Sequence, residues 1–173
     1  MNKLTIIMFA AAAGLLAGGC ANLPSARTDQ DSAADSLIGA WRGKVQFTGG
    51  TLAPVKDLEF MYVFNAGGTM TESSNYDGSP PVPPAYGVWR KTGPRQYEAK
   101  YSCFLTKAPL VFEDIAKGGG WLPGGSVILV EKITVAEDGK SFRSTIKLDG
   151  FDQAGKVTES GSEGGAVGVR MGF

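Results

Sequence analysis

The sequence predicts an all-β domain, a single antiparallel up-and-down β-barrel of eight or nine strands. Short apolar segments recur from Gly39 onward, turn-forming residues separate them at near-regular spacing, and several segments alternate strictly between apolar and polar residues. Alternation of this kind places successive side chains on opposite faces of a strand. Closure into a barrel removes the unpaired edges that a sheet of this length would otherwise expose.

The first three expected strands cover residues 41–47, 58–64 and 69–75. The first alternates, with its large apolar side chains on one face and its basic and amide side chains on the other. The second is apolar on both faces, which predicts a strand that is covered on both sides or central in the sheet. Between the second and the third, residues 65–68 contain two glycines that suit a hairpin turn.

A proline-rich segment at 77–84 follows, and we expect a loop or lid there because proline cannot donate to a strand ladder. Strands are expected again at 86–92 and at 95–106, joined by a Gly-Pro turn. The longer strand places one set of small, apolar and aromatic side chains on a single face, which we expect to point inward: Tyr97, Ala99, Tyr101, Cys103 and Leu105.

The regular succession of strands and turns is interrupted at residues 107–125. Residues 109–117 suit one short helical turn or an irregular strand, and residues 118–125 suit a glycine-rich loop around Trp121. Beyond this loop, turn signals at 137–140 and 152–155 separate segments of high β-propensity. The remaining strands are expected at 126–136 and 141–148, with two closing strands at 157–163 and 166–171.

The first twenty residues predict export. A basic residue near the start precedes an apolar run over residues 4–16, and small residues lead to Cys20. The run is shorter than the ~20 residues that span a bilayer. Residues 16–20, Leu-Ala-Gly-Gly-Cys, resemble a bacterial lipobox, with Ala17 where a large aliphatic residue is usual. The alternative is ordinary secretion with cleavage after Ala21.

The lipobox resemblance implies a signal peptide at 1–19 and acyl chains on Cys20, followed by a flexible tether to residue 37 and the barrel domain at 38–173. Acyl chains anchor a protein stably when more than one is present. Ala21, in place of Asp, implies sorting to the outer membrane, facing the periplasm. Acylation of Cys20 also leaves Cys103 as a lone thiol, so we expect no disulfide.

Composition narrows the chemistry of the domain. The chain has 17 basic residues, 17 acidic residues and no histidine. Without histidine it lacks the commonest general base and the commonest metal ligand, so we assign no catalytic residue, no metal site and no cofactor. The balanced charge gives no basic surface for nucleic acid. The expected partners are a membrane, through the lipid, and a small hydrophobic ligand.

The first strand opens with Gly39-Ala40-Trp41, which resembles the Gly-x-Trp signature of lipocalins and their calycin relatives. In that superfamily an arginine near the end of the last strand packs across this tryptophan and seals the barrel base, and Arg170 stands at the matching place. Lipocalins also carry a helix after the last strand, which this sequence lacks, so the resemblance is to an avidin-like or bacterial calycin-like barrel. Arg170 instead points outward if three neighbours point inward: Val167, Val169 and Met171.

Trp41 and Arg170 are therefore interpreted as a structural plug at a closed end. Inward aromatic side chains could line a ligand cavity or fill the core, because an eight-stranded barrel is just wide enough for either. Three functions stay open: a binder of a small hydrophobic or amphipathic ligand, an interaction lipoprotein that uses the loops around Val82 and Trp121, and a cofactor-free isomerase or cyclase. The candidate lining residues are Phe60, Tyr62, Tyr97, Tyr101 and Phe142.

Overall fold

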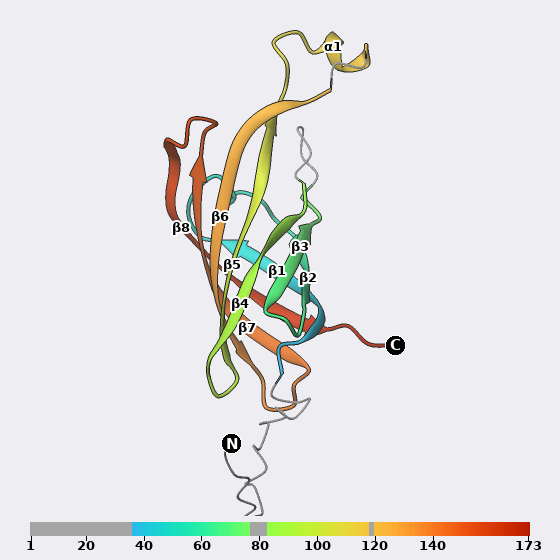
Figure 1. Ribbon diagram of the computed structural model, residues 1–173, viewed down its shortest axis with the longest axis vertical. Coiled ribbons are helices and arrows are strands. Elements are labelled where there is room, and N and C mark those ends of the chain that lie inside the picture. The colour runs from blue at the N-terminus through green and yellow to red at the C-terminus, as the bar shows by residue number, and fades with distance from the viewer. Residues whose placement is uncertain (1–35, 77–82, 118–119) are drawn as a thin grey trace, which may run out of the picture. The chain divides into compact units, whose positions relative to one another are not determined.

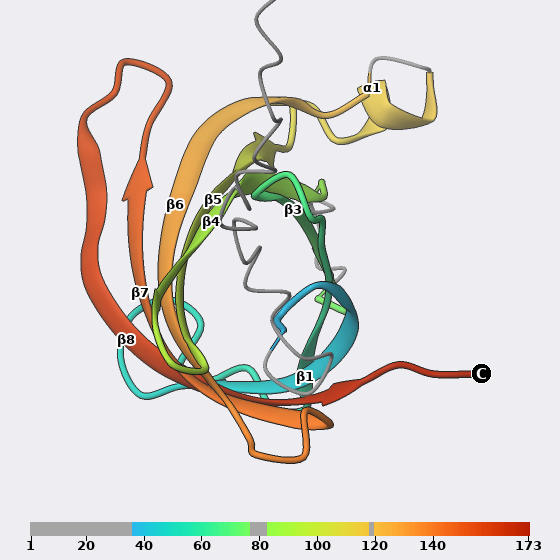
Figure 2. The same ribbon diagram turned by 60° about the horizontal axis from the view of Figure 1, so that its bottom comes forward.

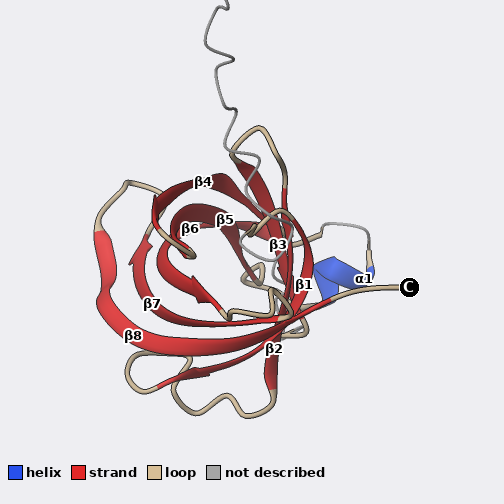
Figure 3. Ribbon diagram, turned by 90° about the horizontal axis from the view of Figure 1, so that it is seen from below, coloured by secondary structure: helices blue, strands red, loops and turns tan. Residues whose placement is uncertain are grey.

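The computed structural model describes residues 36–76, 83–117 and 120–173, so the predictions for the signal peptide, Cys20 and Val82 lie outside the described residues. The described chain forms a closed barrel of eight antiparallel strands, each paired with its neighbours in sequence order (Figure 1). Strand β1 pairs with β2 on one side and with β8 on the other, which closes the ring (Figures 2 and 3). The predicted all-β up-and-down barrel is confirmed, with eight strands.

The elements follow the turn signals of the sequence closely. They are β1 (Gly39–Phe47), β2 (Leu58–Phe64), β3 (Thr69–Ser74), β4 (Ala85–Gly93), β5 (Gln96–Lys107), α1 (Glu113–Ala116), β6 (Leu122–Val135), β7 (Ser141–Phe151) and β8 (Val157–Arg170). The described residues contain no helix with the length and hydropathy that a membrane span requires.

The two closing strands expected at 157–163 and 166–171 are one continuous strand, β8. The glycines at 164–165 that suggested a break lie inside this strand, where Gly164 pairs with Phe47 of β1 and with Ile146 of β7. A Cβ at Gly164 would lie 2.9 Å from Cδ1 of Phe47. The glycine therefore marks a close approach of an aromatic ring to the strand, and not a turn.

One other expectation was wrong in detail. Strand β6 begins at Leu122, four residues earlier than expected, because residues 122–125 pair with the end of β5 across a register shift. Of the two alternatives for β2, the structure supports a strand inside the sheet, since β2 pairs with β1 and with β3. It is covered on one face only, because Met61 and Val63 are 52% and 43% exposed. In a barrel the outer face of each strand meets solvent whatever its composition, so apolar residues on both faces do not require two covering layers.

The barrel interior is packed with apolar and aromatic side chains over most of its height. The ring of Trp41 packs edge-to-face on Phe142 at 5.2 Å, and Phe142 in turn lies 5.9 Å from Tyr62. The ring of Tyr62 is also stacked with that of Phe64 at 5.7 Å. These contacts belong to the lower half of the barrel, where little room is left for a ligand.

One end of the barrel is closed by Trp41 and Arg170. The guanidinium carbon of Arg170 lies 4.1 Å from the centroid of the Trp41 ring. Arg170 also donates hydrogen bonds to the carbonyl oxygens of Gly139, at 2.8 Å, and of Ile38 and Ser36. Arg170 therefore packs across the Trp41 ring at the barrel base, as the calycin resemblance implied. The alternative, in which three neighbouring side chains point inward, is wrong because they are exposed: Val167, Val169 and Met171.

A residue two positions before β1 completes this closed end. Leu37, which the sequence pattern placed in the tether, is fully buried, and its carbonyl oxygen accepts a 2.9 Å hydrogen bond from Nε1 of Trp41. A flexible tether was expected up to this residue because nothing in the preceding polar sequence signals packing. Its leucine side chain is apolar, however, and burial among the core residues removes it from water.

The opposite end carries the longer connections. The β1–β2, β3–β4, β5–β6 and β7–β8 connections all lie at this end, which is uppermost in Figure 1. Strands β5 and β6 extend beyond the rest of the barrel here and carry α1 at their tip (Figure 1). Of the two long loops expected from the sequence at 77–84 and 118–125, residues 77–82 and 118–119 lie outside the described residues, and residues 122–125 belong to β6.

Candidate functional site: an acidic cavity inside the barrel

A cavity of about 320 Å³ lies in the barrel at the end opposite Trp41. Its volume is at the lower limit of what small-molecule sites usually have, roughly 300–1,000 Å³. Its wall is built from β2, β3, β5, β6, β7 and β8 and from the β1–β2 and β3–β4 connections. The lining residues are Thr51, Leu52, Leu58, Phe60, Glu72, Ser74, Tyr76, Cys103, Leu105, Val127, Leu129, Leu148, Gly150, Thr158 and Glu159.

Most of the wall is apolar, and Glu72 is a buried acidic residue within it. Strand β3 alternates so that Met70 and Glu72 both point inward, and Glu72 is only 7% exposed. Its Oε1 atom is buried and has no hydrogen-bond partner among the described residues. Burial, together with the negative charge of Glu131, raises the pKa of the Glu72 carboxyl to about 8. At neutral pH most molecules therefore carry Glu72 as the uncharged acid.

Glu131 lies in the adjoining core and is fully buried on β6. The hydroxyl of Tyr101 donates a hydrogen bond of 2.8 Å to its Oε2, and the hydroxyl of Tyr62 lies 3.5 Å from its Oε1. Burial raises the pKa of Glu131 to about 7, although these hydroxyl groups act in the opposite direction. Burial and the charge of Glu131 also raise the pKa values of Tyr62 and Tyr101, so both phenols remain protonated donors.

A second carboxylate, Glu159, lies at the mouth of the cavity on β8. It accepts hydrogen bonds from the Thr51 hydroxyl at 2.6 Å, the Thr51 backbone N–H at 3.1 Å and the Ser162 hydroxyl at 2.5 Å. Partial burial opposes ionisation, but these hydrogen bonds outweigh it and lower the pKa of Glu159. The mouth therefore carries a negative charge at neutral pH, whereas the Glu72 carboxyl inside the cavity is mostly protonated.

The structure separates the five predicted lining residues into three groups. Phe60 lies in the cavity wall. Tyr62 and Tyr101 lie deeper and direct their hydroxyl groups at Glu131. The other two are buried in the aromatic core: Tyr97, whose ring is 5.7 Å from that of Trp89, and Phe142, beside Trp41.

The two interior carboxyl groups were absent from the sequence prediction, although the alternation contained a signal for each. Glu72 shares its face with Met70, and Glu131 lies between Leu129 and Ile133 on the inward face of β6. A carboxylate on the apolar face of an alternating strand is unusual, because a buried charge needs a partner or must become neutral. The predicted lining residues were all aromatic, and the two carboxylates on the inward faces were not considered.

Cys103 points into the cavity, as expected from the alternation of β5, and is a free thiol. Burial and the nearby Glu72 carboxyl raise the pKa of this thiol to about 11. The thiolate is the reactive form of cysteine, so Cys103 behaves as a small apolar wall residue at neutral pH. The described residues contain no group of three carboxylate or thiol side chains that could hold a metal ion.

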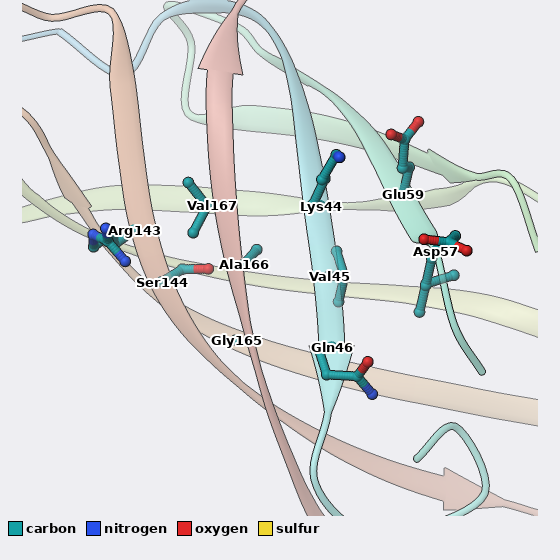
Figure 4. A pocket seen from close by; sticks show the side chains of 11 residues that line it. Lys44, Val45, Gln46, Asp57, Glu59, Arg143, Ser144, Gly165, Ala166 and Val167 are labelled. Atoms are coloured by element: carbon teal, nitrogen blue, oxygen red, sulfur yellow. The ribbon is translucent and has the colours of Figure 1, made fainter. Parts of the chain in front are cut away.

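A larger depression of about 510 Å³ lies on the outer wall, where β1, β7 and β8 run side by side. A Cβ at Gly165 would lie 3.0 Å from the backbone oxygen of Ser144, so β7 and β8 approach each other closely at the floor of this depression. The surrounding Lys44, Gln46 and Arg143 are exposed, and Figure 4 shows that they extend in different directions and not toward a common point. The outer depression therefore lacks the convergent polar groups of a binding site.

Comparison with known proteins identifies no relative. No family model, no curated protein and no solved structure matches the chain. The function is consequently inferred from the interior cavity and from the side chains that line it.

Proposed function

We propose that this protein is a lipid-anchored β-barrel of the bacterial cell envelope that binds a small hydrophobic or amphipathic ligand inside the barrel. The observation that carries the proposal is the buried Oε1 atom of Glu72, which lies without a partner among the described residues in a mostly apolar cavity wall. A buried polar atom of this kind costs about 1–3 kcal/mol. A ligand that brings an apolar body and one complementary polar group removes that cost.

The shape of the interior supports the same function. The Trp41 end is closed by Arg170, so a ligand enters from the end with the longer connections. This division into a sealed base and an open mouth is what a lipocalin-like container requires. The Gly-x-Trp pattern and Arg170 support the calycin relationship, which remains part of this proposal.

Binding of an uncharged, environment-sensitive dye, N-phenyl-1-naphthylamine, tests the function. We expect the purified protein to enhance its fluorescence saturably, with one dye per chain. Val127→Trp on β6 fills part of the cavity and should abolish this binding. Val167→Trp, on the exposed face of β8, is the matched control and should bind as the wild type does.

Folding of both variants is followed by circular dichroism, since an overfilled cavity destabilises a barrel by about 1–3 kcal/mol. If Val127→Trp does not fold, the wild-type protein still decides the question by NMR. Dye binding should then shift the amide signals of Cys103, Leu129 and Leu148, which line the cavity. Absence of saturable binding, or shifts confined to the outer wall, would contradict the proposal.

The anchor is tested separately by the intact mass of the protein purified from membranes. Lipidation predicts a chain that begins at Cys20 and carries the mass of several acyl groups. A chain that begins at Asn22 without added mass would show ordinary secretion instead. Because the signal and Cys20 lie outside the described residues, this part of the proposal depends on the sequence pattern alone.

A second function, binding of a protein partner through the loops, is supported by the tip that connects β5 and β6. Leu110 is fully exposed there, and Val111 and Phe112 are 50% and 61% exposed. The Phe112 ring packs edge-to-face on Trp121 at 6.2 Å, so the two aromatics form one apolar surface. Clustered exposed apolar residues commonly mark an interaction site.

A photo-crosslinking residue placed at position 112 in cells tests this second function, with position 143 on the outer wall as the control. A defined partner that crosslinks only from position 112 supports a docking role for the tip. Equal crosslinking from both positions, or none, counts against it.

A further inference from the structure

We propose that the ligand is a hydrophobic amine, whose ammonium group forms an ion pair with Glu72 while its apolar part fills the cavity. This inference depends on the proposed ligand-binding function and specifies the chemical class of the ligand. It follows from three properties of the described residues: the charge of the cavity wall, the charge of the surrounding core, and the nature of the neighbouring side chains.

The cavity wall contains two carboxylic acids and no basic residue. Glu72 lies inside the cavity and Glu159 lies at its mouth, and neither lysine nor arginine is among the fifteen described residues that line it. An anionic ligand such as a fatty acid would be repelled by the charged Glu159 at the mouth and could not form an ion pair with Glu72. A cation is attracted by Glu159 at the mouth and, inside, by the carboxylate that forms when Glu72 releases its proton, where low dielectric strengthens the interaction.

The core beside the cavity adds to this preference. The charged side chains that are buried in the described barrel are both acids, Glu72 and Glu131. Burial penalises the ionised form of both carboxyl groups, and it raises the pKa of Glu72 to about 8 and that of Glu131 to about 7. A buried carboxylate is stable when a counter-ion accompanies it, and an ammonium group is the counter-ion that the barrel itself does not provide at Glu72.

The rest of the wall matches an amine that carries an apolar body. Phe60 and Tyr76 contribute aromatic rings, which attract cations through their faces. Leu58, Leu129 and Leu148 contribute the aliphatic surface that a hydrocarbon group needs. Glu72 is the one acid inside the cavity among the residues that line it, since Glu159 lies at the mouth and already accepts three hydrogen bonds from Thr51 and Ser162. A monoamine is therefore favoured over a polyamine, whose further charges would lie against leucine side chains.

Binding of an ammonium group should release a proton. At pH 7 Glu72 is largely protonated, whereas the ion pair contains its carboxylate, so its proton passes to solvent as the cation enters. The titratable groups that face Glu72 are Glu131 on β6, Tyr62 on β2, and Tyr101 and Cys103 on β5. The phenols and the thiol remain protonated below pH 9, and ionisation of Glu131 increases the attraction for a cation.

The amine affinity should therefore rise with pH by up to tenfold per unit while Glu72 is protonated, and level off near pH 8. Isothermal titration calorimetry with three probes of equal chain length tests this: octylamine, octanol and octanoate. We expect octylamine to bind at least tenfold more tightly than octanol at pH 8, and octanoate to bind most weakly. Titrations in buffers of different ionisation enthalpy should show close to one proton released per octylamine at pH 7.

Glu72→Gln keeps the size of the side chain and removes its charge. It should reduce octylamine affinity at least tenfold at pH 8 and abolish proton release, while octanol affinity changes little. Glu137→Gln is the matched control, since Glu137 lies in the turn at the closed end with its side chain 89% exposed. It should leave all three affinities unchanged.

The outcomes separate this inference from the proposed function. Octanol or octanoate binding as tightly as octylamine would overturn the amine assignment and leave a ligand-binding barrel. Octylamine binding that is insensitive to Glu72→Gln would also overturn it. If N-phenyl-1-naphthylamine binds and octylamine does not, the inference fails alone, whereas failure of the dye and of all three probes contradicts the proposed function itself.

Discussion

The hydroxyl of Tyr101 donates a 2.8 Å hydrogen bond to Oε2 of Glu131, and the two residues are 1% and 0% exposed. The bond joins β5 to β6 inside the barrel, at the boundary between the packed aromatic core and the cavity. It also connects the core to the candidate site electrostatically, because the charge of Glu131 raises the pKa of Glu72. The protonation states of Glu131 and Glu72 thus link the stability of the barrel to the affinity for the proposed ligand.

Tyr101→Phe should destabilise the barrel by about 1–3 kcal/mol, because it leaves Oε2 of Glu131 buried without this donor. The pKa of Glu131 should rise above its present value of about 7, since the Tyr101 hydroxyl favours the ionised form. Urea unfolding measures the first effect and NMR titration of the Glu131 carboxyl carbon measures the second.

Tyr86→Phe is the control for this substitution, because Tyr86 lies on the outer face of β4 and is 66% exposed. It should change stability by less than about 0.5 kcal/mol. Equal unfolding free energies for the two variants would show that the buried hydrogen bond contributes nothing measurable.

The barrel should lose stability between about pH 5 and pH 8. Both interior carboxyl groups bind a proton more tightly in the folded state than in the unfolded chain, where their pKa is near 4.5. Their stabilising contribution is complete below pH 4.5 and is lost as the pH rises through the folded values of about 7 and 8. A tenfold difference in proton affinity between the folded and unfolded states corresponds to about 1.4 kcal/mol, so the combined loss is on the order of several kcal/mol.

Thermal unfolding of the wild type and of Glu72→Gln, measured in parallel at pH 5, 6, 7 and 8, isolates the part due to Glu72. The melting temperature of the variant should fall less steeply with pH than that of the wild type. If the melting temperatures of the two proteins change with pH in parallel, the pKa of Glu72 does not differ between the folded and unfolded states.

Arg170→Ala should lower the free energy of unfolding by about 2 kcal/mol or more. The substitution removes the cation–π contact with Trp41 and leaves the carbonyl oxygens of Gly139 and Ile38 without their donor. Octylamine binding should persist in conditions where the variant is folded, because the cavity lies at the other end of the barrel.

Arg143→Ala, on the exposed outer face of β7, is the matched control and should change stability by less than about 0.5 kcal/mol. Chemical unfolding followed by tryptophan fluorescence measures both variants. A loss of ligand binding in folded Arg170→Ala would show that the closed end contributes to the site directly.

Gly168→Ala should destabilise the barrel by about 1–3 kcal/mol through overpacking. A Cβ at this position would lie 2.2 Å from Cε1 of Phe142, and that ring is held by Trp41 and Tyr62 on its other sides. Gly67→Ala is the control, since no described atom outside its neighbours lies within 4 Å of the Cβ it would add. Similar melting temperatures for the two variants would contradict the tight contact on β8.

The amino-acid sequence alone was sufficient for the fold class and for much of the strand pattern. Alternation identified the inward faces of β1, β5 and β7, because a strand with one buried face must separate apolar from polar residues at every second position. Alternation does not report whether two glycines form a turn or admit an aromatic ring from a neighbouring strand. Gly164 was therefore assigned to a break, and its contact with Phe47 became clear only in the barrel.

The candidate site depended on the tertiary structure. The sequence identified inward aromatic residues, and Phe60 lies in the cavity wall while Tyr97 and Phe142 fill the core. Whether an inward side chain lines a cavity depends on its height in the barrel relative to residues on other strands. Glu72 and Glu131 are 59 positions apart, as their residue numbers show, and only closure of the barrel places their carboxyl groups close enough for one to raise the pKa of the other. Local sequence pattern determined which side chains point inward, and long-range packing decided which of them form a site.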